Sequence, residues 1–181
     1  MLAREVGPSG QVIAVEANPH NASAALKNRE LNGMHQVEII QAAVSDRSGR
    51  VVFNEGLDGQ LDDGSGAGGR MTVDAITIDG LVDRFGRPDL VFIDIEGAEC
   101  LALAGTSRAL ASGADFAVEV HVGYGLEKLG GTIERLFSFF PSDRFSVLGR
   151  SEGDETFRPL TRGDPLTRGR FFMLALSKQQ S

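Results

Sequence analysis

The fold is decided by the segment Asp89-Leu90-Val91-Phe92-Ile93-Asp94-Ile95-Glu96-Gly97-Ala98-Glu99. Residues 90–94 predict a strand buried on both faces, as in the interior of a parallel sheet. The reactive groups of such a sheet lie just beyond the carboxyl ends of its strands, which is where Asp94 and Glu96 stand. Gly97 permits a tight turn, and Glu99 falls in the first turn of the following helix, where the helix dipole favours a carboxylate. Taken alone, the segment fits a capped turn as well as it fits a site.

Length and charge narrow the class of protein. A chain of 181 residues is expected to form one domain with a continuous core. Its net charge of -7 and the lack of a Lys/Arg-rich run argue against nucleic acid as the partner, so we expect a small molecule instead. No segment reaches the roughly 20 apolar residues of a membrane span, and no signal peptide is evident, so the cytoplasm is the expected location. The single cysteine, Cys100, is expected to be a small core residue rather than a nucleophile.

Apolar periodicity predicts alternating strands and helices along the chain. The strands are expected at residues 11–16, 37–40, 51–53, 70–73, 90–94, 116–121, 145–148 and 171–176, and the helices near residues 2–6, 18–32, 77–85, 99–105, 106–113 and 133–140. This alternation predicts a three-layer α/β sandwich around a mostly parallel sheet, with the last two strands as an antiparallel pair at one edge. The glycine-rich segment 54–69 is interpreted as a solvated loop, because Asp58, Asp62 and Asp63 do not match the spacing of a calcium-binding loop.

Polar residues gather at the carboxyl ends of the predicted strands. Ligands bind at this end of an α/β sheet, so a rim of such residues indicates a site better than any single member does. The rim consists of Glu16, Asp46, Asp94, Glu96, Glu119 and His121.

Each member of this rim has a chemical role and a plainer alternative. Glu16 can accept hydrogen bonds from the two hydroxyls of a ribose, whereas Asp46 fits either an adenine amino group or an ordinary turn. His121 can remove a proton from a hydroxyl, oriented by Glu119 or Asp94, or it can simply hydrogen-bond within the rim. A metal ion held by Asp94, Glu96 and His121 is not indicated by the spacing, so no metal is expected.

Several motifs together resemble the FkbM family of S-adenosylmethionine-dependent methyltransferases. The resemblance runs in order from about residue 2 to about residue 125, and its most specific piece is the run from Ile93 to Glu99. It implies a class I methyltransferase fold, which is Rossmann-like, and methyl transfer to a hydroxyl of a sugar or natural-product type small molecule. The matching motifs are Val12-Ile13-Ala14-Val15-Glu16-Ala17-Asn18-Pro19, Leu31-Asn32, Ala43-Val44-Ser45-Asp46 with Gly49, Ile76-Thr77-Ile78-Asp79, Phe92 to Glu99, and Glu119-Val120-His121.

The resemblance also implies roles for individual residues. Glu16 would hold the ribose of S-adenosylmethionine, and Asn18 with Ser45 and Asp46 would border its adenine. The segment from Asp94 to Glu99 would face the methionine end and the acceptor. Glu119 and His121 would do so as well, so that Asp94, Glu119 and His121 form the expected catalytic group, and Asp94 and Glu96 also contact the cosubstrate.

The sequence departs from the family pattern at its start. Such proteins begin with a strand and a glycine-rich turn, but only Met1 to Gly10 precede the first predicted strand here. Residues 1–181 are therefore expected to form a single methyltransferase-like domain whose sheet lacks its first strand. We expect either a gap between the strands that end at Glu16 and Asp94, or their direct pairing. In both cases the cosubstrate should bind weakly, and tight binding of S-adenosylhomocysteine in calorimetry would argue against this expectation.

Two other functions fit the rim. A nicotinamide-dependent oxidoreductase would also use Glu16 on a ribose, and its distinguishing feature would be a G-x-G-x-x-G turn before the Glu16 strand. In a non-catalytic, methyltransferase-like binding module, the rim acids would serve only as a solubilising surface, and the module would bind no nucleoside.

Overall fold

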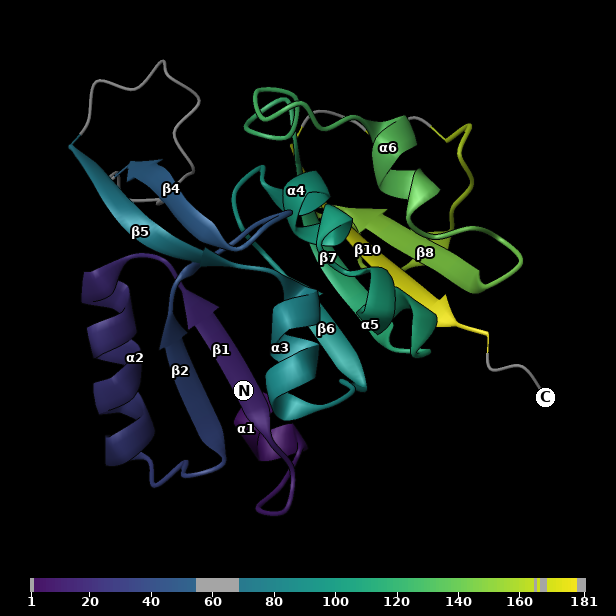
Figure 1. Cartoon of the computed structure of the whole chain (residues 1–181). Helices are drawn as coiled ribbons and strands as arrows, with labels where there is room; N and C mark the ends of the chain where they lie inside the picture. Colours follow the sequence, from purple (N-terminus) through teal and green to yellow (C-terminus); the bar gives the residue numbers. More distant parts are fainter. Residues whose placement is uncertain (1, 55–68, 165, 167–168, 179–181) are drawn as a thin grey trace.

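The computed structural model describes residues 2–54, 69–164, 166 and 169–178 (Figure 1). The helices are α1 (Leu2–Glu5), α2 (Pro19–Leu31), α3 (Ile78–Phe85), α4 (Glu99–Ala104), α5 (Ser107–Ala111) and α6 (Ile133–Ser138). The strands are β1 (Val12–Glu16), β2 (Val37–Gln41), β3 (Ala43–Val44), β4 (Gly49–Asn54), β5 (Arg70–Ile76), β6 (Leu90–Ile93), β7 (Asp115–Val122), β8 (Phe145–Ser151), β9 (Arg158–Pro159) and β10 (Gly169–Ser177). The predicted order of strands and helices is confirmed, whereas Asp58, Asp62 and Asp63 lie outside the described residues.

The first unit of the fold is a parallel strand pair with one helix against it. β1 pairs with β2 in parallel, with Val12 opposite Val37 and Glu16 opposite Gln41. α2 packs on this pair, and it begins at Pro19, whose fixed φ suits the first helical position (Figure 1). The side-chain oxygen of Asn18 accepts hydrogen bonds from the first backbone N–H groups of α2. Local sequence signals therefore account for this unit.

The largest sheet has the strand order β6-β7-β10-β8-β9. β6 and β7 are parallel, and the other neighbours are antiparallel, so the expected antiparallel pair of β8 and β10 is confirmed. Most of the buried apolar side chains pack on this sheet, among them three phenylalanine rings in edge-to-face contact, Phe116, Phe140 and Phe145. Cys100 belongs to the same core, as its apolar surroundings in the sequence predict.

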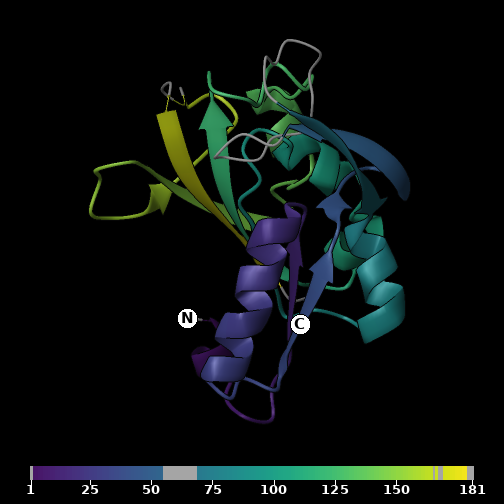
Figure 2. The same cartoon turned by 90° about the vertical axis from the view of Figure 1, so that its left-hand side faces the viewer.

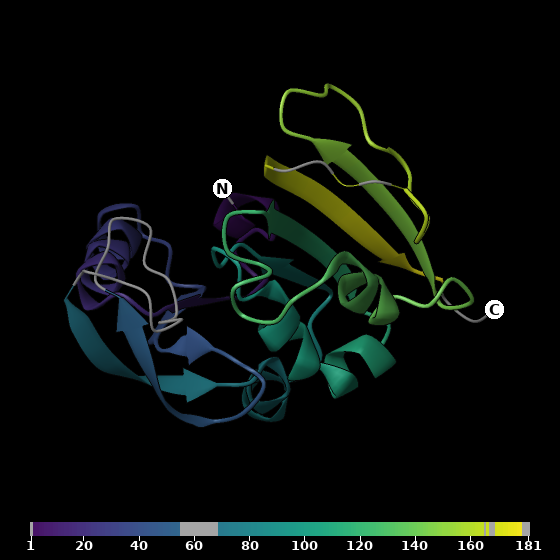
Figure 3. The same cartoon turned by 90° about the horizontal axis from the view of Figure 1, so that it is seen from above.

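The strands do not form one continuous sheet. Three hydrogen-bonded groups are present among the described residues: β1 with β2, β3 with β5 and β4, and the five-stranded sheet. β4 and β5 form the expected antiparallel hairpin. β3 pairs in parallel with β5 and also contacts β1. β1 and β6 are not paired with each other, and Figure 3 shows the groups that contain them apart. Figure 2 shows α2 lying in front of β1 and β2. Of the two outcomes expected for this part of the sheet, the structure therefore shows the gap.

β6 corrects the expectation of a strand buried on both faces. Leu90 and Phe92 are 47% and 57% exposed, whereas Ile93 is buried. Successive side chains of a strand point to opposite faces, so the face that carries Leu90 and Phe92 is open and the other face is packed. Their exposure means that no element of the described part of the chain packs over this face. Among the described residues, β6 also stands at the edge of its sheet, where it pairs with β7 alone.

Candidate active site

The end of β1 is held in place by the start of α2. Glu16 is the last residue of β1, and its Oε1 accepts a hydrogen bond of 2.8 Å from the backbone N–H of Asn18. The side chain of Asn18 in turn caps α2, accepting from the backbone N–H groups of His20 and Asn21. Glu16 is thus fixed at the rim, whereas the side-chain oxygen of Asn18 is engaged by its own helix.

A cleft joins the ends of β1 and β6. Glu16 lines it on one side and Asp94 and Glu96 on the other, so the structure brings together three of the predicted rim residues. The volume of the cleft is about 130 Å³. The remaining lining residues are Val15, Ala17, Asn21, Ala42, Ala43, Val44, Phe53, Ile95 and Ala98.

Ser45 and Asp46 stand beside this cleft but are not among its lining residues. Ser45 is buried, its hydroxyl donates to Oδ1 of Asp46 at 3.1 Å, and its backbone N–H donates to the carbonyl of Ile76. Their predicted contact with an adenine stays a prediction, because the structure places only the preceding Ala43 and Val44 in the cleft.

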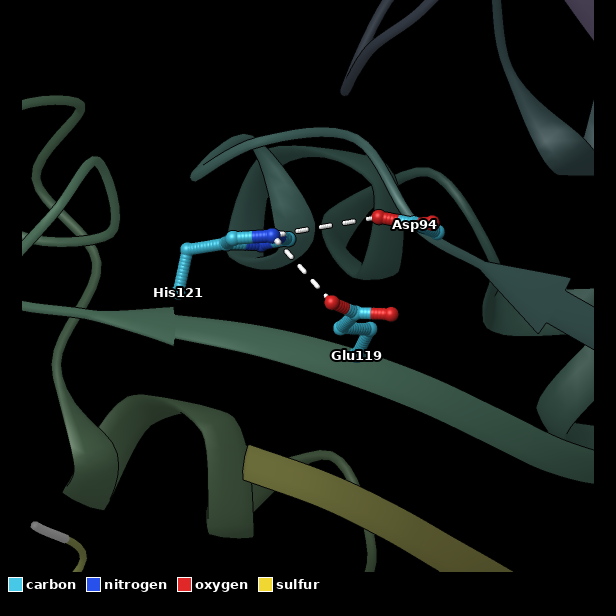
Figure 4. Close-up of side chains that lie close together, drawn as sticks. All are labelled: Asp94, Glu119 and His121. Carbon is cyan, nitrogen blue, oxygen red and sulfur yellow. Dashed lines mark ion pairs between the residues drawn. The ribbon is translucent and has the colours of Figure 1, made fainter. Parts of the chain in front are cut away.

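His121 lies at the centre of an acidic cluster in which His121 and Glu99 are buried and Asp94 is exposed. His121 projects from β7 and is 3% exposed, and Figure 4 shows its ring pointing toward Asp94 and Glu119. Its Nδ1 lies 2.7 Å from Oε1 of Glu99. Its Nε2 lies 3.3 Å from Oε2 of Glu96, 3.7 Å from Oε1 of Glu119 and 3.8 Å from Oδ1 of Asp94. The prediction that the ends of β6 and β7 meet is therefore confirmed.

Glu99 is the functional residue whose part in the site the sequence did not reveal. The sequence suggests that Glu119 or Asp94 orients His121, but the carboxylate that accepts a hydrogen bond from Nδ1 is that of Glu99, which is fully buried at the start of α4. Glu99 also accepts the backbone N–H of Gly97 at 2.8 Å. The signal that could have identified it is a carboxylate within an otherwise apolar helix, since buried acids require partners.

The turn after β6 aims Glu96 at His121. Glu96 has φ 50° and Gly97 has φ 106°, so two consecutive residues adopt conformations with positive φ. For a residue with a side chain this costs roughly 1–2 kcal/mol. Gly97 also packs against the backbone of Gly125, which follows β7. The strained turn at the end of β6 is thus locked against the loop that follows β7.

Burial and neighbouring charges both shift the pKa values of the cluster, and for His121 they act in opposite directions. Burial lowers the pKa of His121, but the hydrogen bond that Nδ1 donates to Glu99 and the negative charges of Glu99, Glu96 and Asp94 outweigh it, and the net effect is a raised pKa. The pKa of Glu119 is raised by burial and by the charge of Asp94, against the opposing influence of His121 and Arg170. Both groups therefore keep a proton to a higher pH than they would in water.

A larger hollow lies elsewhere. Its volume is about 700 Å³, and it sits where β1 and β2 begin, with Gly10, Gln11, Val37 and Glu38 among its lining residues. The amino ends of these strands are opposite to the rim, and ligands of α/β sheets bind at the carboxyl ends. The smaller cleft is therefore the better candidate site.

The fold agrees with the comparisons with known proteins. A fold similar to that of the chain is found in the crystal structure of methyltransferase FkbM from Methylobacillus flagellatus KT, with a TM-score of 0.58 and 18% sequence identity. The match covers 96% of this chain and 40% of that chain, so the chain spans less than half the length of that protein. The family profile described as the methyltransferase FkbM domain matches residues 1–141, and the chain belongs to this methyltransferase family.

Two negative findings complete the comparison. No curated protein matches the sequence. Among the described residues, no helix combines the length and the apolar character needed to cross a membrane.

Proposed function

We propose that the chain serves as an S-adenosylmethionine-dependent O-methyltransferase domain that acts on a hydroxyl of a sugar or natural-product type small molecule. Family membership supports methyl transfer, and the observation that carries the proposal is the cleft in which Glu16 faces Asp94 and Glu96. The framework would be a class I, Rossmann-like sheet, with residues 1–181 as a single domain in the cytoplasm.

In this proposal the cosubstrate lies across the gap between β1 and β6. Glu16 accepts the ribose hydroxyls, since a carboxylate can accept further hydrogen bonds beside the one from Asn18. Ser45 and Asp46 border the adenine near the end of β3, together with the turn at Asn18. Asp94 and Glu96 face the methionine end, which carries the positively charged sulfur.

The acidic cluster stands on the acceptor side of this cleft. The acceptor oxygen forms a bond to the methyl carbon as the bond from that carbon to sulfur breaks, which leaves S-adenosylhomocysteine. The hydroxyl proton passes to His121 or to a carboxylate beside it, Glu119 or Asp94. The protein contributes mainly by aligning the oxygen with the methyl group.

The size of the cleft supports weak cosubstrate binding by this chain. A volume of about 130 Å³ is below the roughly 300–1,000 Å³ of typical ligand pockets. Moreover, β1 and β6 are not hydrogen-bonded to each other, so the two sides of the cleft are not held by one sheet. S-adenosylhomocysteine is therefore expected to contact the rim without being enclosed.

The ribose contact can be tested by replacing Glu16. Glu16→Gln keeps an oxygen for the Asn18 backbone N–H but removes the charge, so the affinity for S-adenosylhomocysteine should fall about tenfold. Glu30→Gln makes the same change at an exposed site on α2 and should leave the affinity unchanged. Equal affinity of the two variants in a ligand titration would contradict the role of Glu16.

The role of His121 is tested by measuring two properties of one variant, its turnover and its affinity for S-adenosylhomocysteine. His121→Ala should lower methyl transfer from radiolabelled S-adenosylmethionine to a panel of sugars and polyhydroxylated natural products by about 10²–10⁴-fold. The affinity for S-adenosylhomocysteine should remain within about twofold, because the ring lies behind Asp94 and Glu96 and not in the cleft itself. Unchanged turnover would remove His121 from the mechanism.

A further inference from the structure

We propose that Asp94, Glu119 and His121 bind a divalent transition-metal cation such as Mn²⁺. One oxygen of each carboxylate and Nε2 of the imidazole all lie within 4.8 Å of one another (Figure 4). The inference does not depend on methyl transfer, because it concerns the cation-binding property of the cluster. It also revises the expectation from sequence spacing, which indicated no metal.

The first argument is that the hydrogen bond to Glu99 fixes the orientation and the tautomer of the His121 imidazole. A histidine that binds a metal generally donates its other ring N–H to a carboxylate, which fixes the tautomer and makes the ligating nitrogen more basic. Glu99 occupies this second position, with Oε1 2.7 Å from Nδ1. When Nδ1–H donates to Glu99, Nε2 presents its lone pair to the cluster. The arrangement is the one that a metal-binding histidine requires.

The second argument is that Nε2 itself lacks a hydrogen-bond partner. It is buried, and it makes no hydrogen bond to any of the described residues. The side chain of His121 is 4% exposed, so bulk water does not replace the missing partner. An orphaned buried nitrogen aimed into a group of carboxylates indicates a ligand that the protein atoms do not supply.

Distances within the cluster are close to those of a coordination shell. Ligand atoms about 2.1 Å from a cation stand roughly 3.0–3.4 Å apart in tetrahedral or octahedral sites. Nε2 lies 3.7 Å from Oε1 of Glu119 and 3.8 Å from Oδ1 of Asp94. Closing these two distances requires shifts of about half an ångström, and the oxygens of Asp94 and Glu119, which lie within 4.8 Å of each other, would also have to approach through side-chain rotation.

Charge balance points in the same direction. Glu96 and Glu99 add two more carboxyl groups to those of Asp94 and Glu119, and the guanidinium of Arg170 lies 3.6 Å from Glu119. The second oxygen of Glu99, Oε2, is also buried without a hydrogen-bond partner among the described residues. A cation at Nε2 would offset this excess of negative charge in a setting where burial strengthens the attraction.

The ligand set indicates the class of cation. One imidazole and two carboxylates suit Mn²⁺, Zn²⁺ or Fe²⁺ better than Mg²⁺ or Ca²⁺, which prefer oxygen ligands alone. Three protein ligands leave positions for water or for an acceptor oxygen. A cation there would make a bound hydroxyl more acidic. Because Asp94, Glu119 and His121 would then be ligands, the proton would pass instead to Glu96, whose carboxylate stands beside them.

The proposal is tested with the whole chain and Mn²⁺ alone. Calorimetry and the paramagnetic resonance signal of free Mn²⁺ should show one saturable site. Asp94→Asn and His121→Ala should weaken Mn²⁺ binding at least tenfold, and Glu99→Gln by about 10–100-fold through its effect on the imidazole. Asp89→Asn is the matched control, because this fully exposed side chain lies five residues before Asp94, and it should bind Mn²⁺ like the unsubstituted chain.

A measurement on the unsubstituted chain avoids any effect of the substitutions on folding. Substoichiometric Mn²⁺ should broaden the imidazole resonances of His121 before those of His20 and His35, which are exposed. Absence of saturable binding would overturn the proposal, and so would equal broadening of all three histidines or unchanged binding by Asp94→Asn. A protonated imidazole would then account for the cluster. Neither result bears on S-adenosylhomocysteine binding, so failure here is distinguishable from failure of the proposed function.

Discussion

Glu99 is the residue on which the geometry of the site depends. It is fully buried, and one of its oxygens accepts both the backbone N–H of Gly97 and the hydrogen bond from Nδ1 of His121. The first contact fixes the turn after β6, and the second fixes the imidazole on β7. A single carboxylate therefore connects the ends of β6 and β7, which form the acceptor side in the proposed function.

Removing this carboxylate should destabilise the protein strongly. Glu99→Ala leaves two buried donors without an acceptor, so the free energy of unfolding should fall by about 3–5 kcal/mol. Urea denaturation followed by circular dichroism measures the change. Glu152→Ala, at an exposed glutamate, should cost less than about 0.5 kcal/mol. A loss below about 1 kcal/mol for Glu99→Ala would contradict the description of this residue as a buried link.

The sequence predicted which residues would lie close together where their position depends only on the direction of the strands. Asp94, Glu119 and His121 follow or end buried strands, and parallel neighbours place such ends together, so their meeting follows from the sequence alone. The part played by Glu99 does not, because the contact between positions 99 and 121 depends on how α4 packs over β7. Nothing in local periodicity reports that packing.

At the level of elements, the turn between β6 and α4 is the most constrained segment of the site. Gly97 has φ 106°, and a Cβ at this position would meet the backbone of Gly125. The close approach of the two backbones holds the end of β6 against the loop that follows β7. Both features require glycine.

Gly97→Ala should therefore lower stability and disturb the site together. The strained φ and the clash with Gly125 should cost about 2–4 kcal/mol in urea denaturation. The matched control is Gly163→Ala, because a Cβ there has open space and the backbone conformation does not demand glycine. Similar stabilities of the two variants would show that the close approach of residues 97 and 125 is not required.

The open face of β6 leads to a second prediction at this scale. Phe92→Ala should change the free energy of unfolding by about 1 kcal/mol or less, since Phe92 is 57% exposed. Phe116→Ala, the same substitution at a fully buried ring on the neighbouring β7, should cost about 3–5 kcal/mol. If the two substitutions cost the same in thermal or urea denaturation, the open face of β6 is in fact covered in solution.

Sequence periodicity predicted elements better than it predicted burial. The four apolar residues of β6 indicated a strand in the interior of a sheet, and the strand exists, but its partner on one side is absent among the described residues. Apolar composition reports which side chains favour burial, whereas the actual burial depends on the elements that pack against them. The N-cap at Asn18 and the hairpin of β4 and β5 were predictable because their causes are local.

At the scale of the whole molecule, the gap between β1 and β6 is the central feature. It separates Glu16 from Asp94 and Glu96, yet all three line one cleft, so the site spans two sheets rather than one. The motifs of the sequence indicated the family, whereas a gap and a direct pairing of these two strands were both expected outcomes. The pairing of β10 between β7 and β8 could not be derived in the same way, because it depends on contacts between residues distant in the chain.

The most direct test of the account is a titration of the isotopically labelled chain with S-adenosylhomocysteine, followed by backbone amide NMR, which detects weak binding. We predict saturable shifts confined to residues 16–18, 43–46 and 94–98, with little change at Gly10, Gln11 and the start of β2 beside the larger hollow. Shifts concentrated at that hollow, or no shifts at millimolar ligand, would contradict a cosubstrate site between β1 and β6.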